Sequence, residues 1–470
     1  MAKEYMEKLH NATVELLGKT GVYAGSEKAL EIFEDYSVRV DRTSKRVFPG
    51  EKHIERALAS APGAFRLYGR NDEGPLIFGG SKIYFLSGGA SLRVLDMSGS
   101  YVVATLEHLR QFNTLLDALP NIHVMINQVD PHEFHGKNLY TLLAAEMLVG
   151  TSKPVCMQAH TAGDVKAMFE MGSAVRGSGK ALTEKPLFFV GLNAEPPMAI
   201  SGEIADALLA CCEMGIPCSL GNYNMMGITA PRTVAGAVVQ LNAVQLTAII
   251  LIQAFRPGHP LFYTAFSGSG NMQTLDPITS DPLSVQQQRF AVLLGRSYRM
   301  PVYSFAGTDS RMPDSQAACE HALQFQIAMD SGCNLLQGPT SMMDQMMLSS
   351  FAQTIIDHDI ISYILECSKT PAIDPETLAL DVIHEAVIDP DLKDMKFSAH
   401  RHTIDHINEG SWKPMSFSYD SFSSWQKDGE KSLVRIANET AARSIESHRP
   451  DPLPPELIGN IRAVCEEYTS

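Results

Sequence analysis

Short apolar runs alternate with longer helix-like segments through the central part of the chain. Uninterrupted apolar runs of this length, bounded by glycine, proline and polar residues, are typical of buried strands. They cover residues 83–90, 122–129, 154–160, 187–193, 217–223, 261–267, 302–308 and 334–340. The intervening stretches, such as TLEHLRQFNTLLDALP and AGDVKAMFEMGSAV, have helical patterns. The sequence therefore predicts eight buried strands that alternate with helices.

This alternation favours an α/β fold, and the number of strands favours a (β/α)8 TIM barrel over residues 81–370. Glycine and proline precede several strands, in SKPV, GIPC and RMPV, where a helix must end and a parallel strand begin. A doubly wound open sheet is the alternative. It would require a glycine-rich phosphate loop after the first strand, and SGGAS does not match G-x-G-x-x-G.

Two flanking segments complete the predicted organisation. Residues 1–80 form an N-terminal helical extension, with a short strand pair at VRVDRTSKRVF. The first predicted barrel strand is followed by LRVLDMSGSYVV, which indicates an inserted hairpin. Residues 371–470 are predicted to be a C-terminal helical segment packed on the barrel.

The composition argues against several classes of protein, among them nucleic-acid-binding and membrane proteins. Of 470 residues, 45% are apolar and 19% are charged, which is ordinary for a globular chain. A net charge of -15 argues against a nucleic-acid surface. No uninterrupted run of 18 apolar residues occurs, and the charged N-terminal helix lacks the apolar centre of a signal peptide. We therefore expect a cytoplasmic protein without a membrane span.

Metal and disulfide chemistry find little support in the sequence. None of the eight cysteines forms a C-x-x-C pair, which favours buried free thiols. His402 and His406 have the i, i+4 spacing of metal ligands, but nothing near them completes a tetrahedral set. We expect no bound metal.

Aromatic side chains gather at the carboxyl ends of the predicted strands, where barrel active sites lie. They are Tyr223, Tyr263, Phe266, Tyr303 and Phe305. No Ser-His-Asp signature or dense carboxylate cluster accompanies them. An aromatic pocket without a nucleophile suits a cation held by ring faces, or chemistry supplied by a cofactor. The alternative is that these rings are simply layers of the barrel core.

Several long segments resemble the trimethylamine methyltransferase (MttB) superfamily. They include ELLGKTGVYAGSEKALEIFEDYSVRVD, TAPRTVAGAVVQLNAVQLTAIILIQAFRPGHPLFY, GTDSRMPDSQAACEHAL and HTIDHINEGSWKPMSF, in an order that runs almost end to end. The resemblance implies a β/α-barrel methyltransferase that presents a methyl group of a methylated amine to Co(I) cobalamin. It also implies that a partner corrinoid protein carries the cobalamin, so this chain binds no cofactor tightly itself.

The resemblance further points to one branch of that superfamily. Its founding members contain pyrrolysine, whereas this chain shows only the twenty standard residues. It therefore resembles the non-pyrrolysine branch, whose substrates are quaternary amines. Glycine betaine is the favoured substrate and proline betaine the second. Alternative substrates are carnitine and γ-butyrobetaine. Alternative functions are a methyltransferase that uses a folate or free cobalamin, and a barrel that binds the amine without turnover.

The geometry of a β/α barrel then predicts roles for the residues at the strand ends. The cation cage is predicted to be Tyr223, Tyr263, Phe266, Tyr303 and Phe305. Contacts to a substrate carboxylate or other polar group are predicted for His160, Asn193, Asn224, Asp309 and Arg311. The rim that faces the corrinoid is predicted to include Gly88, Gly89 and Gln337. We also expect a homo-oligomer, with the apolar segment 234–255 in the core or in an interface.

Overall fold

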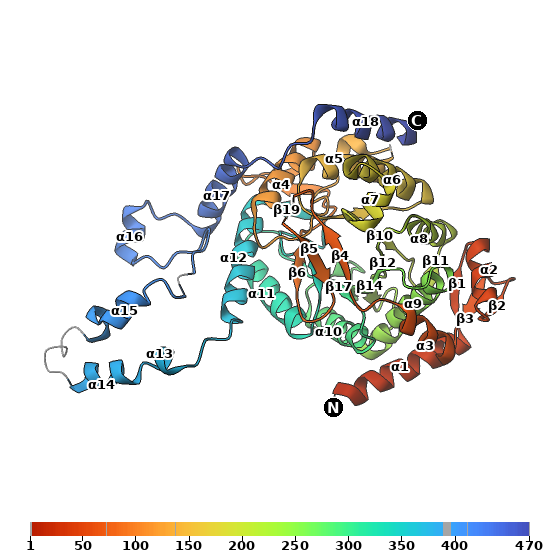
Figure 1. Cartoon of the computed structure of the whole chain (residues 1–470), viewed down its shortest axis with the longest axis horizontal. Coiled ribbons are helices and arrows are strands. Elements are labelled where there is room, and N and C mark those ends of the chain that lie inside the picture. Colours follow the sequence, from red (N-terminus) through yellow and green to blue (C-terminus); the bar gives the residue numbers. More distant parts are fainter. Residues whose placement is uncertain (1, 72, 137, 389–395, 411, 470) are drawn as a thin grey trace.

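The computed structural model describes residues 2–71, 73–136, 138–388, 396–410 and 412–469. Its centre is a curled, parallel sheet of seven strands surrounded by helices (Figure 1). In spatial order the strands are β6 (Tyr84–Leu86), β18 (Leu335–Gln337), β17 (Val302–Phe305), β14 (Leu261–Ala265), β12 (Cys218–Gly221), β10 (Phe188–Asn193) and β9 (Val155–Gln158). Each lies within a predicted strand, so the α/β class and the parallel sheet are confirmed.

The predicted strand at residues 122–129 is not a regular strand. It makes isolated parallel bridges from Val124 to Leu86 on one edge strand and from Met125 to Val155 on the other. The ladder beside β6 is interrupted because the Ser87 side chain replaces a backbone partner. Its Oγ accepts from the N–H of Ile126 at 2.9 Å and donates to the carbonyl of the same residue at 3.1 Å. Eight regular strands were expected, and seven strands with one irregular segment are found.

Helices cover the outer side of the sheet. They are α4 (Leu106–Ala118), α5 (Leu139–Gly150), α6 (Ala162–Arg176), α7 (Gly179–Glu184), α8 (Gly202–Met214), α9 (Val234–Phe255), α10 (Pro282–Ser297), α11 (Ser315–Asp330) and α12 (Phe351–Cys367). Several begin at a side chain that accepts a hydrogen bond from the first turn, as Thr161 does for α6 and Asp314 for α11. These caps place the helix starts directly after the carboxyl ends of the strands.

Helix α9 is long and apolar enough to cross a membrane by length and composition alone. However, 83% of its most apolar stretch is buried inside the protein, where it packs against α1 (Ala2–Lys19), α3 (Glu51–Ser60) and α10. Its polar side chains have internal partners, since Asn242 Nδ2 donates to Thr13 Oγ1 at 3.0 Å. The segment 234–255 is thus a core helix of this fold.

The N-terminal region is tied to the central sheet. It contains α2 (Glu27–Asp35) and a four-stranded sheet of β11 (Ala199–Ile200), β1 (Val22–Ala24), β3 (Arg46–Phe48) and β2 (Arg39–Asp41). The predicted strand pair is the antiparallel pair β2–β3. Strand β1 runs parallel to β11, which follows β10, so the N-terminal region is fixed to a loop of the central sheet.

A hairpin that the sequence analysis missed fills the amino-terminal end of the sheet. It consists of β4 (Phe65–Tyr68) and β5 (Pro75–Phe78). The ring centroids of Phe65 and Phe78 lie 4.8 Å and 5.1 Å from that of Phe262, near the start of β14. All three rings are buried. The hairpin therefore closes this end with packed aromatic side chains and leaves the carboxyl end for ligands.

Small strands frame the carboxyl end. The predicted inserted hairpin is β7 (Arg93–Leu95) with β8 (Tyr101–Val103), and β7 also pairs with β19 (Leu348–Ser350). A second small sheet contains β13 (Asn224–Met226), β15 (Ser267–Gly270) and β16 (Pro277–Ile278), and a short 3-10 helix, η1, spans His132–Phe134. These insertions surround the end of the sheet at which the predicted site residues lie.

The C-terminal segment divides into two parts. Helices α17 (Leu433–Ser447) and α18 (Pro455–Thr469) pack on the helix layer. The preceding stretch extends away from the rest of the molecule (Figure 1). It contains α13 (Pro375–Leu378), α14 (Leu380–Ile388), η3 (Lys396–Ala399), α15 (Arg401–Asp405) and α16 (Phe422–Lys427). The expectation that all of residues 371–470 lie on the barrel is therefore wrong for this stretch.

Candidate functional site

A connected series of aromatic rings runs from the sealed end of the sheet to its carboxyl end. The ring of Phe262 lies 5.7 Å from that of Tyr303, and Tyr303 lies 5.0 Å from Phe266. Phe266 contacts Phe305 at 5.5 Å, edge to face, and Phe305 contacts Tyr223 at 5.6 Å. Four of the five predicted cage residues are thus brought together.

Tyr223, Phe266 and Phe305 form the outer part of this series, and we call these three residues the aromatic cluster. They follow or end three neighbouring strands, β12, β14 and β17. Tyr223 and Phe266 are partly exposed, whereas Phe305 is buried. The exposed Asn193 side chain joins them, because a Cβ on Gly221 would lie 2.3 Å from Asn193 Oδ1 and 3.0 Å from Phe266. Only glycine at position 221 allows this approach.

Tyr303 lies beneath the aromatic cluster. Its hydroxyl donates to Gln337 Oε1, and burial raises the pKa of the phenol well above its usual value. Gln337 in turn lies against Gly89, where a Cβ would come within 3.0 Å of Gln337 Nε2. Gln337, Gly88 and Gly89 are all buried, so the structure places them under the rim rather than on it. Gln337 supports the cluster from below through Tyr303, Gly89 lies against Gln337, and Gly88 lies against Gln128 and Thr340.

Two predicted site residues point into the helix layer. Tyr263 is completely buried, and its hydroxyl donates to Asn242 Oδ1 on α9 at 3.0 Å. Asn224 is also buried, and its Nδ2 donates to the carbonyl of Ala237 at 3.1 Å. Both side chains have structural partners, and the structure places them outside the predicted cage and polar contact set.

Two other predicted polar contacts lie on the periphery. His160 Nε2 is 3.0 Å from Glu203 Oε2, and half of the His160 side chain is exposed. Arg311 Nε is 3.4 Å from Asp344 Oδ1, and its side chain is 68% exposed. Neither is brought against the aromatic cluster.

Asp309 anchors the loop between β16 and α10. Its carboxylate accepts the backbone N–H groups of Thr279 and Ser280 at 2.9 to 3.1 Å, and it also accepts both of their hydroxyls. It lines a cavity of about 770 Å³ between α10 and α11, together with Asp281, Glu320 and Arg311. Three carboxylates therefore gather on the side of the site nearest β17.

Buried polar atoms near the aromatic cluster have no partner among the described residues. They are the Tyr223 hydroxyl and both amide atoms of Asn222. Burial raises the pKa of Tyr223 far above its usual value, and the charges of Asp309 and Asp281 raise it further. An unpaired buried polar group costs about 1 to 3 kcal/mol, so these atoms are candidates for ligand contacts. Asn222 was missed as a site residue, although it adjoins Tyr223 at the same strand end.

Asp130 lies partly buried just after the irregular segment 122–129. Burial raises the pKa of its carboxyl from 3.8 to about 6, although Asn127 Nδ2 donates to Oδ1 at 2.6 Å. The folded protein therefore holds this proton more tightly than the unfolded chain does. The resulting contribution to stability is complete below pH 4 and is lost as the pH rises through 6.

We expect Asp130→Asn to remove this pH dependence, because an amide keeps the acceptor for Asn127 without a charge. Its free energy of unfolding relative to wild type should rise by about 2 kcal/mol between pH 4 and pH 7.5. Urea denaturation at the two pH values measures the difference. An equal effect of the substitution at both pH values would contradict the assignment.

The described residues contain no group of three or more His, Cys, Asp or Glu side chains arranged to hold a metal ion. The rings of His402 and His406 lie 4.2 Å apart, but on the projecting part of the C-terminal segment. The candidate site therefore offers aromatic faces, carboxylates and unpaired amide and hydroxyl groups.

The family model "Trimethylamine methyltransferase (MTTB)" matches residues 1–468. The chain belongs to this family. Relatives of the MTTB family match along nearly their whole length. The trimethylamine methyltransferase MttB of Desulfitobacterium hafniense (strain DSM 10664 / DCB-2) is 27% identical over 467 residues, which cover 99% of this chain and 92% of the relative. The glycine betaine methyltransferase of Desulfitobacterium hafniense (strain Y51) is 25% identical over 473 residues, which cover 98% and 95%.

The fold of this MTTB-family chain is similar to a solved structure. The crystal structure of the Methanosarcina barkeri monomethylamine methyltransferase (MtmB) superposes with a TM-score of 0.53 and 10% sequence identity. The match covers 94% of this chain and 86% of that chain. It supports the mixed α/β architecture, and the matched relatives identify the chain as a methyltransferase of the MTTB family.

Proposed function

We propose that this methyltransferase moves a methyl group from a quaternary amine to Co(I) of cobalamin carried by a separate corrinoid protein. The observation that carries the proposal is the aromatic cluster of Tyr223, Phe266 and Phe305 at the carboxyl ends of three adjacent strands. Membership of the MTTB family supports methyl transfer from a methylated amine.

The aromatic cluster suits an ammonium group that has no N–H to donate. Ring faces attract such a cation, and each desolvated contact contributes about 2 kcal/mol. The carboxylates of Asp281 and Asp309 add negative potential next to the Tyr223 hydroxyl. A quaternary amine leaves as a neutral tertiary amine, so this chain has to hold and orient the substrate and needs no general acid. The corrinoid supplies the nucleophile at Co(I).

The polar groups beside the cluster favour a betaine as the substrate. The amides of Asn193 and Asn222 and the hydroxyl of Tyr223 are available to donate hydrogen bonds to a carboxylate. Glycine betaine is the preferred substrate in this proposal and proline betaine the second. Carnitine and γ-butyrobetaine have the same two charges and are the alternatives.

Exposed apolar side chains on the loops of the carboxyl end suit the approach of the corrinoid protein. These side chains are Leu92, Tyr101, Val103, Ile228, Met272, Leu275, Met312 and Met347. The Tyr101 hydroxyl donates to the carbonyl of Arg311, which joins the β7–β8 hairpin to the loop after β17. In the same proposal, segment 122–129 closes the sheet into a (β/α)8 barrel, and the enzyme acts in the cytoplasm.

A methylation assay with a panel of amines tests the proposal. Purified protein is mixed with the reduced corrinoid protein and with glycine betaine, proline betaine, carnitine, γ-butyrobetaine or trimethylamine. We expect conversion of the Co(I) spectrum to that of methyl-Co(III), fastest with glycine betaine. Preference for trimethylamine would contradict the substrate class. Thermal stabilisation by a betaine without any methyl-Co(III) would instead identify a binding protein.

A further inference from the structure

A buried histidine and a buried aspartate join α11 to α12, and we call them the His321–Asp357 pair. His321 Nδ1 lies 2.7 Å from Asp357 Oδ1, and both side chains are completely buried. The other ring nitrogen, His321 Nε2, has no hydrogen-bond partner among the described residues. The imidazole stacks on Phe325, with the ring centroids 5.1 Å apart. In an open cleft such a pair would indicate acid–base catalysis, so its burial needs another explanation.

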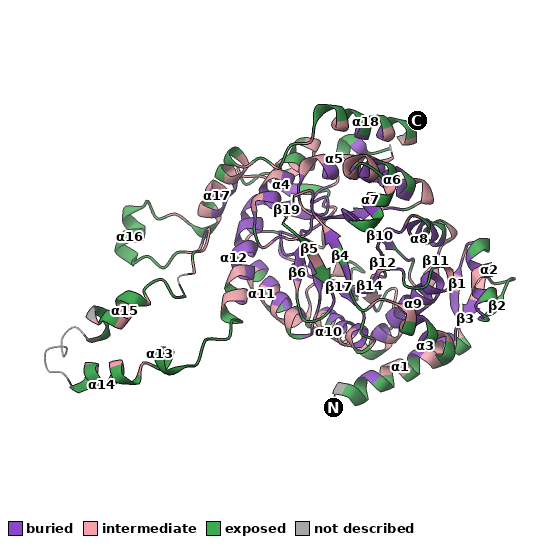
Figure 2. Cartoon of the chain, in the orientation of Figure 1, coloured by how far each residue is buried: buried purple, intermediate pink, exposed green. Residues whose placement is uncertain are grey.

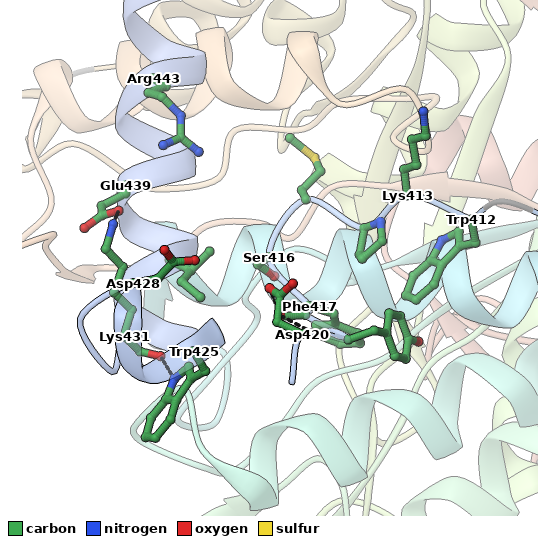
Figure 3. Close-up of a pocket in the computed structure, with 15 residues that line it drawn as sticks. Trp412, Lys413, Ser416, Phe417, Asp420, Trp425, Asp428, Lys431, Glu439 and Arg443 are labelled. Carbon is green, nitrogen blue, oxygen red and sulfur yellow. Dashed lines mark hydrogen bonds and ion pairs between the residues drawn. The ribbon is translucent and has the colours of Figure 1, made fainter. Parts of the chain in front are cut away.

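The cavities beside α11 and α12 do not reach the His321–Asp357 pair. Residues 351–361 of α12 are all buried, and Figure 2 shows much of this helix as buried. A cavity of about 610 Å³ lies where the C-terminal segment meets α12, around Trp412 and Phe417, and the pair does not line it (Figure 3). The larger cavity between α10 and α11 does not include the pair either. The pair therefore acts on its neighbours in the fold and not on a ligand.

Asp357 holds the loop between β18 and β19, residues 338–347, which we call the β18–β19 loop. Its Oδ2 accepts the backbone N–H of Ser341 at 2.7 Å. Its Oδ1 accepts from Gln353 Nε2 at 2.7 Å and contacts His321 Nδ1. A buried carboxylate is stable only where donors surround it. Because His321 and Gln353 fix Oδ1, they also direct Oδ2 at Ser341.

The β18–β19 loop has a strained backbone. Four of its residues other than glycine have a left-handed conformation: Ser341, Asp344, Gln345 and Met346, with φ of +66°, +45°, +58° and +70°. This conformation is unfavourable for any residue with a Cβ, and it persists only where surrounding contacts impose it. The N–H of Asp344 donates to the carbonyl of Ser310 at 3.0 Å, which is a second anchor. The shape of the loop therefore depends on its anchors.

The β18–β19 loop in turn holds the end of β17, which carries Phe305. The N–H of Thr308 donates to the carbonyl of Met342 in the loop at 2.8 Å. The N–H of Ala306 donates to the carbonyl of Gln337, directly before the loop, also at 2.8 Å. Phe305 directly precedes Ala306 and belongs to the aromatic cluster. A continuous series of contacts thus leads from the His321–Asp357 pair to this ring.

We propose that His321 and Asp357 are positioning residues for the aromatic cluster. They keep the β18–β19 loop in its strained conformation, and the loop keeps Phe305 in place. Neither residue touches the substrate, and the proposal rests on the proposed binding of a quaternary amine by the cluster. Attraction between a cation and a ring depends on where the ring face lies. Displacement of Phe305 should therefore weaken binding of a cation more than binding of a neutral molecule of the same shape.

Calorimetric binding of glycine betaine and of 3,3-dimethylbutanoate, in which carbon replaces the ammonium nitrogen, tests the proposal. Wild type should prefer the betaine about 30-fold. In His321→Leu this preference should fall about tenfold, because the donor to Asp357 is lost. His321→Asn keeps a donor at the position of Nδ1 and should stay within about twofold of wild type. A purely structural role would lower stability without changing the preference.

His358→Leu is the matched control, because it is the same substitution on the residue next to Asp357. His358 is buried, and neither of its ring nitrogens has a hydrogen-bond partner among the described residues. Its removal should leave the preference for the betaine within about twofold of wild type. Gln353→Leu removes the other side-chain donor to Asp357 Oδ1 and provides the same test if His321→Leu does not fold.

Hydrogen exchange measured by mass spectrometry follows the loop and β17 without any amine. His321→Leu should accelerate exchange of the amides of Ser341 and Thr308 at least about tenfold, and His321→Asn should not. Unchanged exchange at Thr308 would overturn the proposal, and so would an unchanged preference for the betaine despite faster exchange. A wild type without that preference would contradict the proposed function, whereas exchange at Thr308 decides the positioning of β17 by itself.

Discussion

Replacing Phe266 by leucine is expected to lower kcat/KM for the quaternary amine about 30-fold. Leucine keeps an apolar side chain at the end of β14 but removes the ring face that Tyr303 and Phe305 hold in place. A desolvated cation–π contact contributes about 2 kcal/mol, and each 1.4 kcal/mol corresponds to a tenfold change in rate. Initial rates of methyl-Co(III) formation at low amine concentration measure the effect.

Phe262→Leu is the matched control, because it is the same substitution near the start of β14, the strand that Phe266 directly follows. Its ring packs on Phe65 and Phe78 at the sealed end. It should reduce stability by about 1 kcal/mol and leave kcat/KM within about twofold. A neutral inhibitor with a tert-butyl group in place of the trimethylammonium should bind wild type and Phe266→Leu equally. Equal losses of activity in both variants would exclude a role for the Phe266 ring in cation binding.

Replacing Gly338 by alanine is expected to destabilise the protein by about 4 kcal/mol or more. Gly338 has φ of +102°, and its N–H donates to the carbonyls of Leu86 and Ser87 at 3.2 and 3.3 Å. An added Cβ would lie 1.8 Å from the carbonyl oxygen of Ala306. The clash is with backbone and cannot be relieved by a rotamer change. The three strands β6, β17 and β18 would have to separate at their carboxyl ends.

Gly258→Ala separates the effect of a steric clash on stability from the effect of the left-handed backbone conformation. Gly258 has φ of +80°, but no atom lies within 4 Å of the position of an added Cβ. It should cost only about 1 to 2 kcal/mol, the usual penalty of a left-handed conformation for alanine. Urea unfolding of the three proteins gives both values. Similar losses in the two variants would show that the close approach of Ala306 is unimportant.

The sequence predicted the succession of strands and helices but not which side of each strand faces the interior. In LFYTA, all five positions of β14 are buried, because helices cover one side of the sheet and the packed interior covers the other. No polar alternation remains to distinguish Phe262 from Tyr263. The sequence therefore indicated Tyr263 together with Phe266, whereas Phe262 rather than Tyr263 joins Phe266 in the aromatic series.

The roles of polar residues at strand ends were also hard to predict from the sequence. Asn224 and Asp309 stand where ligands bind in barrels, yet their partners are Ala237 and the loop at Thr279. Such contacts depend on the tertiary structure, and nothing in the local pattern distinguishes them from ligand contacts.

The β4–β5 hairpin was predictable, since AFRLYGRNDEGPLIF has two apolar runs around a turn. The described helices between α12 and α17 were predictable too, but not the direction in which they project.

The sealing hairpin β4–β5 gives the proposed active site a single entrance. The rings of Phe65 and Phe78 fill the amino-terminal end, so the amine, the demethylated product and the corrinoid must all use the carboxyl end. A docked corrinoid protein would then block the passage of the small molecules. For the proposed reaction, this makes the order of events compulsory. The amine binds first, the corrinoid protein docks second, and the product leaves only after the corrinoid protein has departed.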